Sequence, residues 1–133
     1  MDSNLLVYAY DRGSGVKHER ARDLVKDLWQ AGNGVLSTQV LQEFYVNIRR
    51  KAKSPLLPGE AARVVENYLS WEIVVNTGRS ILQAFHLEDR FRISFWDALI
   101  IQAANSAGAR TLYTEDLNHD QVYGFVRVVN PLL

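Results

Sequence analysis

Acidic residues at helix starts and strand ends are the side chains of this sequence best suited to chemistry, because carboxylate oxygens are the ligands that hard divalent cations prefer. Asp2 stands in Asp-Ser-Asn, directly ahead of an apolar helical stretch. Glu43 falls beside the apolar stripe of a helix expected over residues 39–51. Each also has an ordinary structural explanation. Asp, Ser and Asn all favour the N-cap of a helix, and Glu43 could pair with Asn47 one turn later.

Two further carboxylates, Asp97 and Asp116, lie in the second half of the chain. Asp97 follows Ser94 with the spacing of a capping box, which explains both residues structurally, yet its apolar neighbours would shield it partly from water. Asp116 comes just after a strand expected over residues 111–114, in a polar loop where turn residues are common. Ligands of parallel sheets bind outside the carboxyl ends of the strands, so this position favours a functional role.

The segments that would position these carboxylates alternate between helical and extended patterns. Helices are expected over residues 16–31, 39–51, 58–69, 77–87 and 94–107, and strands over 35–36, 72–75, 111–114 and 125–129. Strands separated by helical crossovers imply a parallel sheet covered by helices on both faces. We therefore expect an α/β fold, a three-layer α/β/α sandwich with a central parallel sheet.

The composition is that of a single globular domain over residues 1–133, with 47% hydrophobic and 23% charged residues. Fifteen basic residues balance fifteen acidic ones, so net charge neither supports nor excludes an RNA substrate. The absence of cysteine excludes disulfides, thiolate nucleophiles and cysteine–zinc sites. No apolar run is long enough to cross a membrane and no signal peptide is visible, so we expect a cytoplasmic protein without a membrane partner.

The order and context of the four carboxylates together resemble the PIN domain. The shared features are Asp-Ser-Asn ahead of an apolar stretch, Glu in the second major helix, Asp opening a long apolar helix, and Thr-x-Asp after a late strand. The closest blocks are Ser-x-x-Asp-Ala-Leu-Ile from Ser94 and Leu-Tyr-Thr-Glu-Asp-Leu-Asn up to Asn118. The resemblance spans nearly the whole chain. Within the family, the chain resembles the VapC-type ribonuclease toxins of type II toxin–antitoxin systems.

This resemblance implies a pocket in which four catalytic carboxylates bind Mg²⁺ or Mn²⁺, namely Asp2, Glu43, Asp97 and Asp116. Crowded carboxylates repel one another, so such a pocket needs cations to be occupied in its ionised form. The ion lowers the pKa of a water molecule that attacks phosphorus, and it stabilises charge on the phosphate oxygens. The implied activity is hydrolysis of RNA phosphodiester bonds. Asn4 and Thr114 are implied to orient the carboxylates or to contact phosphate.

A basic run, Arg49-Arg50-Lys51, closes the helix that carries Glu43. Cations near a helix C-terminus complement the helix dipole, which is a structural explanation for all three residues. The same side chains could instead form a rim that contacts RNA phosphates. Both interpretations remain open from the sequence.

The sequence departs from the PIN pattern at its start. In the family, a hydrophobic strand that lies centrally in the sheet ends at the first acidic residue, whereas only Met1 precedes Asp2 here. Loss of a central strand would expose two strand edges and apolar surface. We expect the first strand to be missing from this chain, either because the true start lies upstream of Met1 or because the sheet is rebuilt in another way.

The resemblance also implies partners. They are an RNA substrate, a small antitoxin protein that covers or enters the acidic pocket, and a second copy of the chain in a homodimer. The alternative is a PIN-like module that binds RNA or protein without cutting; the four carboxylates argue against it and the missing strand argues for it. A receiver-like phosphate-transfer domain is a third class, but the sequence lacks the paired acids and the late lysine that it would need.

Overall fold

The computed structural model describes all of residues 1–133 and confirms the expected alternation of helices and strands. The elements in chain order are α1 (Ser3–Tyr10), the short 3₁₀ helix η1 (Arg12–Ser14), α2 (Val16–Ala31), β1 (Val35–Ser37), α3 (Thr38–Arg50), α4 (Pro58–Tyr68), β2 (Glu72–Val74), α5 (Gly78–Phe91), α6 (Phe95–Ser106), β3 (Thr111–Tyr113), β4 (Val122–Tyr123) and β5 (Val126–Val129). None of the helices is long and apolar enough to span a membrane.

Short polar side chains define where the helices begin. Ser37 accepts a hydrogen bond from the Val40 amide at 3.2 Å at the start of α3, and Ser94 accepts one from the Asp97 amide at 3.1 Å at the start of α6. Thr77 caps α5 in the same way. These hydrogen bonds satisfy amides that have no partner within the helix. Glu43 on α3 and Asp97 on α6 are therefore carried by helices whose first turns are fixed.

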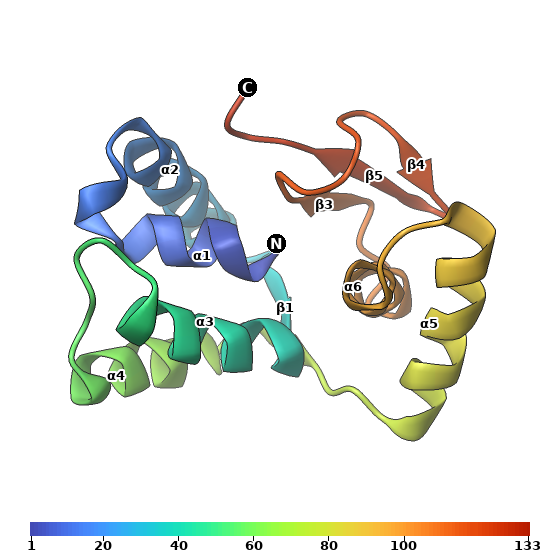
Figure 1. The fold of residues 1–133 in the computed structure, drawn as a ribbon, viewed down its shortest axis with the longest axis horizontal. Coiled ribbons are helices and arrows are strands. Elements are labelled where there is room, and N and C mark those ends of the chain that lie inside the picture. The colour runs from blue at the N-terminus through green and yellow to red at the C-terminus, as the bar shows by residue number, and fades with distance from the viewer.

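The strands form a sheet in two separate parts, each built around one parallel pair. β1 pairs in parallel with β2, while β3 pairs in parallel with β5, which pairs on its other side with the antiparallel strand β4. The α/β architecture with parallel strands is confirmed, and α6 contacts strands of both parts. Figure 1 shows helices α1 to α4 gathered in one group, with α5 and α6 lying against the other part.

A cavity of about 700 Å³ lies between the two parts of the sheet. Residues of both β1 and β3 line it, together with apolar side chains of α6 such as Ile100. Neither strand has a second pairing partner, so both keep one unpaired edge, as expected for a sheet without its central strand. The Asp2 amide donates to the Tyr113 carbonyl at 2.9 Å, so the chain ahead of α1 is held against the end of β3.

The apolar core follows the same division. A larger cluster holds α1 to α4 together around fully buried side chains that include Leu5, Leu6 and Phe44. A smaller one packs Ile101 of α6 against β3, β4 and β5. Full burial of one such side chain contributes roughly 1.5–3 kcal/mol. The larger cluster therefore fixes α1, which follows Asp2, against α3, which carries Glu43.

Asp11 ties the end of α1 to the loop that follows α3. Its buried carboxylate accepts hydrogen bonds from the Gly13 amide, the Ser14 hydroxyl, the Lys53 amide and the Ser54 amide at 2.8–3.1 Å. Burial alone would raise the pKa of Asp11, but these hydrogen bonds hold that pKa below its ordinary value. Hydrogen bonds to charged groups each contribute about 1.5–3 kcal/mol. Asp11 is thus a structural carboxylate that sets the position of α1 relative to α3.

Candidate functional site

Asp2 is a buried carboxylate at the N-terminus of α1, with 4% of its surface exposed. Its Oδ1 accepts from the Leu5 amide at 3.1 Å, as the N-cap interpretation predicts, and its Oδ2 accepts from the Thr114 hydroxyl. Burial raises the pKa of Asp2 to about 6, although both hydrogen bonds oppose the rise. The structural and the functional interpretation of Asp2 are therefore compatible, because one oxygen caps the helix and the other faces Thr114.

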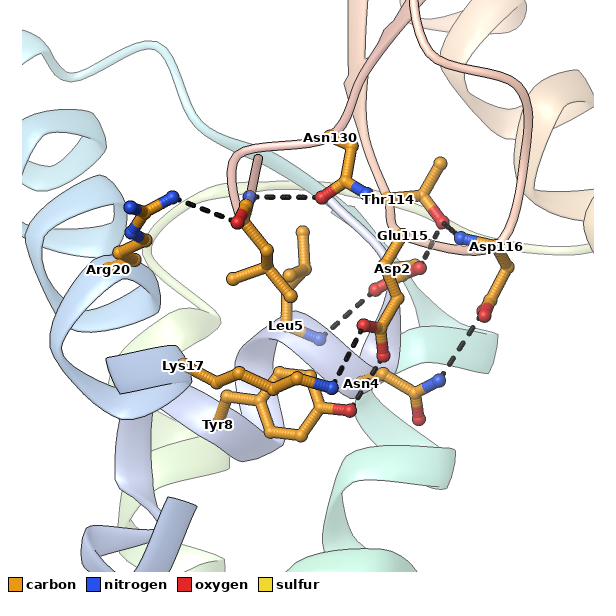
Figure 2. A network of polar contacts seen from close by, with 11 residues as sticks. Asp2, Asn4, Leu5, Tyr8, Lys17, Arg20, Thr114, Glu115, Asp116 and Asn130 are labelled. Carbon is orange, nitrogen blue, oxygen red and sulfur yellow. Dashed lines mark hydrogen bonds and ion pairs between the residues drawn. The ribbon is translucent and has the colours of Figure 1, made fainter. Parts of the chain in front are cut away.

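Asp116 lies beside Asp2 because Thr114 contacts both residues. The Asp116 amide donates to the Thr114 hydroxyl oxygen at 3.1 Å, and Asn4 donates to Asp116 Oδ2 at 3.3 Å (Figure 2). Burial raises the pKa of Asp116, and the negative charges of Asp97 and Glu115 raise it further. The structure thus places Asn4 and Thr114 where they orient two carboxylates from opposite ends of the chain.

Glu43 extends from α3 toward the same cluster. Burial raises its pKa, the Ser3 and Gln39 side chains lower it, and the charges of Asp97 and Asp116 raise it again. Its Oε1 atom is buried and has no hydrogen-bond partner. A buried carboxylate oxygen without a donor is costly unless a cation or a water satisfies it.

Asp97 completes the group from the first turn of α6. Its amide is used by the Ser94 cap, which leaves its carboxylate free of any role in starting the helix. The charge of Asp97 contributes to the raised pKa values of both Glu43 and Asp116, so the three carboxylates lie within electrostatic range. Asp116 is in turn coupled to Asp2. Asp116 therefore lies within electrostatic range of the other three sequence-predicted carboxylates, and the four, which come from four segments of the chain, are called the carboxylate cluster below.

The oxygen-rich composition of this cluster fits a hard divalent cation. Two further observations support the fit: the unsatisfied Glu43 Oε1 atom, and the raised pKa values that mutual repulsion helps to produce. No three Asp, Glu or His side chains already surround a common point at metal-binding distance. Binding of an ion would therefore require carboxylate side chains of the cluster to rotate toward it.

The basic run does not join the cluster. Arg49, Arg50 and Lys51 lie at the C-terminal end of α3, about two helical turns beyond Glu43. Arg49 lies over the ring of Tyr45, with its guanidinium carbon 4.8 Å from the ring centroid. This geometry favours the structural explanation for Arg49, and contact of the run with RNA stays a prediction.

Three residues beside the cluster carried no signal in the sequence. Tyr8 donates a hydrogen bond from its hydroxyl to Glu115 Oε1 at 2.6 Å, and Lys17 Nζ lies 3.5 Å from Glu115 Oε2 (Figure 2). Tyr8 and Lys17 come from α1 and α2, whereas Glu115 is the direct neighbour of Asp116. The fold alone brings them together, because they are about a hundred positions apart in the sequence.

Comparison with known families agrees with this geometry. The model of the PIN domain matches residues 1–124, which is most of the chain and includes all four carboxylates. No curated protein matches the sequence. PIN domains are in general nucleases that use divalent metals. The carboxylate cluster, the parallel strands and the match over nearly the whole sequence lead to one conclusion: the chain belongs to the PIN domain family.

Proposed function

We propose that the protein is a metal-dependent endoribonuclease that hydrolyses RNA phosphodiester bonds. The observation that carries this proposal is the convergence of Asp2, Glu43, Asp97 and Asp116 on one cluster, with raised pKa values for three of them. Such an arrangement is costly for the folded protein unless bound cations offset the repulsion. Family membership supports a nuclease, and the choice of RNA and of a toxin role goes beyond it.

The four carboxylates would hold Mg²⁺ or Mn²⁺, which supplies a lowered water pKa and charge stabilisation at the scissile phosphate when bound. The neighbouring side chains keep those carboxylates in place. Thr114 holds the positions of Asp2 and Asp116 together, and Asn4 fixes one oxygen of Asp116. These contacts hold Asp2 and Asp116 in place before an ion binds, and preorganised electrostatics is usually the largest contribution to catalysis. Water is the nucleophile in this proposal, so no covalent bond to the protein forms.

We further propose that the enzyme is the toxin of a toxin–antitoxin pair in the cytoplasm, that it acts as a homodimer and that a small antitoxin blocks its acidic site. Exposed apolar side chains around the start of α6 support a protein partner there. Trp96 is 62% exposed, Leu82 is 60% exposed and Phe85 is 48% exposed. Contiguous exposed apolar side chains of this size commonly mark protein–protein contacts.

A second candidate is a PIN-like module that binds RNA or protein without cutting. The lack of three Asp, Glu or His side chains already surrounding a common point favours it. The two candidates differ in a measurable way, since only the nuclease cuts.

Incubation of the purified protein with a mixed pool of structured and single-stranded RNAs tests the proposed function. We expect cleavage in Mn²⁺ or Mg²⁺, none in excess chelator, and full recovery when the metal is added back, because the carboxylates act only with a bound cation. Products are read on a denaturing gel. Binding of the pool without cleavage in either metal would favour the non-catalytic module. Cleavage that persists unchanged in chelator would exclude the proposed chemistry.

A further inference from the structure

Lys17 carries a side-chain ammonium group that the fold places beside Glu115, the direct neighbour of the cluster carboxylate Asp116. Of the three ion pairs in the protein, only that of Lys17 with Glu115 adjoins a cluster carboxylate, Asp116. The Lys17 side chain is 53% exposed, and its Nζ atom also lies 5.0 Å from the centroid of the Tyr8 ring. Figure 2 shows Lys17 extending along this ring toward Glu115.

The two partners of this ion pair differ in how firmly they are held. Glu115 is 18% exposed, and its other oxygen accepts the short hydrogen bond from Tyr8. Lys17 has three donor hydrogens and one carboxylate partner at 3.5 Å, so it keeps donors free. Exposed ion pairs contribute little to stability, because water screens the two charges. An incoming anion can therefore replace Glu115 as the partner of Lys17 with little loss of stability, and Glu115 keeps its hydrogen bond from Tyr8.

Two other cations of α2 and α3 are engaged elsewhere. Arg20 donates to the carbonyls of Leu132 and Leu133 at 2.7–2.8 Å. Arg49 lies over Tyr45 at the far end of α3. An RNA strand that approaches four carboxylates needs positive charge beside them, because a bound metal offsets the repulsion only at the metal itself. Lys17, held next to Asp116 by its ion pair with Glu115, is in a position to supply it.

We propose that Lys17 binds an RNA phosphate next to the scissile one, exchanging Glu115 for the phosphate, and that Glu115 and Tyr8 are positioning residues that hold the lysine at the rim of the cluster. This inference rests on the proposed function, since it concerns the substrate of that site. It deepens that function by naming how the strand is held. A flexible lysine suits this role as a point charge, because one phosphate oxygen is enough to engage it.

The test measures RNA binding apart from cleavage. The parent protein carries Asp97→Asn and is assayed with a fluorescent single-stranded RNA in Ca²⁺, by anisotropy at several salt concentrations. In this background Lys17→Gln is expected to weaken binding about fivefold and to lower the slope of log K against log salt by about 0.7. Lys17→Arg should keep the parental slope. Lys26→Gln, an exposed lysine on the same helix, is the matched control and should change neither quantity.

Each other result has a defined meaning. Equal affinity and equal slope for Lys17→Gln and the parent would reduce the ion pair to a structural contact and overturn the inference. A parent that binds no RNA would overturn it as well. If the unsubstituted protein cuts RNA and Lys17→Gln lowers kcat with KM unchanged, Lys17 acts in the chemical step and the binding role is wrong. If Lys17→Gln weakens RNA binding while the unsubstituted protein cuts nothing, the proposed nuclease fails and the phosphate contact stands.

Discussion

Replacement of Asp97 by asparagine is expected to lower metal-dependent RNA cleavage by at least about a hundredfold. Loss of a residue that only hydrogen-bonds to a metal ligand already lowers metal affinity or activity by about 10–100-fold, and Asp97 is a proposed ligand itself. The side chain keeps its size and loses its charge. Helix α6 should be unaffected, since Ser94 bonds the backbone amide of residue 97 and not its side chain. The loss should therefore appear in the cleavage rate measured with saturating Mn²⁺. The circular dichroism spectrum and the melting temperature in chelator should stay those of the unsubstituted protein.

The matched control for this substitution is Asp89→Asn. Asp89 is an exposed aspartate of α5 that forms no ion pair and lies outside the carboxylate cluster. Its removal changes the net charge by the same amount, so it reports any general effect of charge on RNA binding. We expect cleavage by Asp89→Asn at the rate of the unsubstituted protein. Cleavage by Asp97→Asn at that same rate would show that Asp97 is not part of the catalytic site.

Replacement of Asp2 by asparagine is expected to stabilise the metal-free protein near neutral pH. The folded pKa of Asp2 is about 6, above the ordinary value of 3.8, because the carboxyl group is buried. The folded state thus binds more protons than the unfolded state between about pH 4 and pH 6, and the free energy of unfolding falls as pH rises through that range. Above it, the ionised Asp2 costs up to about 3 kcal/mol. Asparagine carries no such penalty.

Urea denaturation in chelator, at about pH 4.5 and about pH 7.5, measures this effect. Asp2→Asn should be more stable than the unsubstituted protein at the higher pH, and the difference should shrink at the lower pH. Mn²⁺ at a thousand times its Kd should reverse the order at the higher pH, since it stabilises by about 4.1 kcal/mol and only the intact site binds it well. A stability difference independent of pH would contradict the assigned burial of a charged Asp2.

Local signals made much of the fold predictable. Helix starts at Ser37, Thr77 and Ser94 follow from residue types that bond the next turn, and such bonds need no distant partner. The end of α5 was placed too early, at Leu87, because the helix continues to Phe91 and ends on Arg92 with a positive φ of 55°. No glycine marks that position, and a left-handed arginine leaves no signature in the sequence.

The divided sheet and its added strand depend on contacts that the sequence does not record. β4 has only two residues, Val122 and Tyr123, and pairs with β5 through a turn at Gly124, whose φ is +67°. Two residues are too few to produce a period-2 pattern. The unpaired edges of β1 and β3 were among the expectations, but the cavity between them is a result of tertiary packing.

The candidate site divides in a similar way. Its carboxylates could be named from their positions beside helix starts and strand ends and from the family resemblance, while no local pattern gives their mutual coupling. The link through Thr114 joins residues 112 positions apart. The contacts of Tyr8 and Lys17 with Glu115 also join residues that are far apart in the sequence, and each of these residue types is common on protein surfaces. Only the approach of α1 and α2 to the loop after β3 reveals them.

The most direct measurement of the central claim, that the four carboxylates form one cation site, is a calorimetric titration with Mn²⁺ near neutral pH. The proteins compared are the unsubstituted chain, Asp97→Asn, Glu43→Gln and the control Asp89→Asn. We predict equal Mn²⁺ affinity for the unsubstituted chain and the control, and affinity at least about tenfold weaker for the two site variants, which change ligands on different helices. Mn²⁺ affinity that is the same in all four proteins would contradict a shared site.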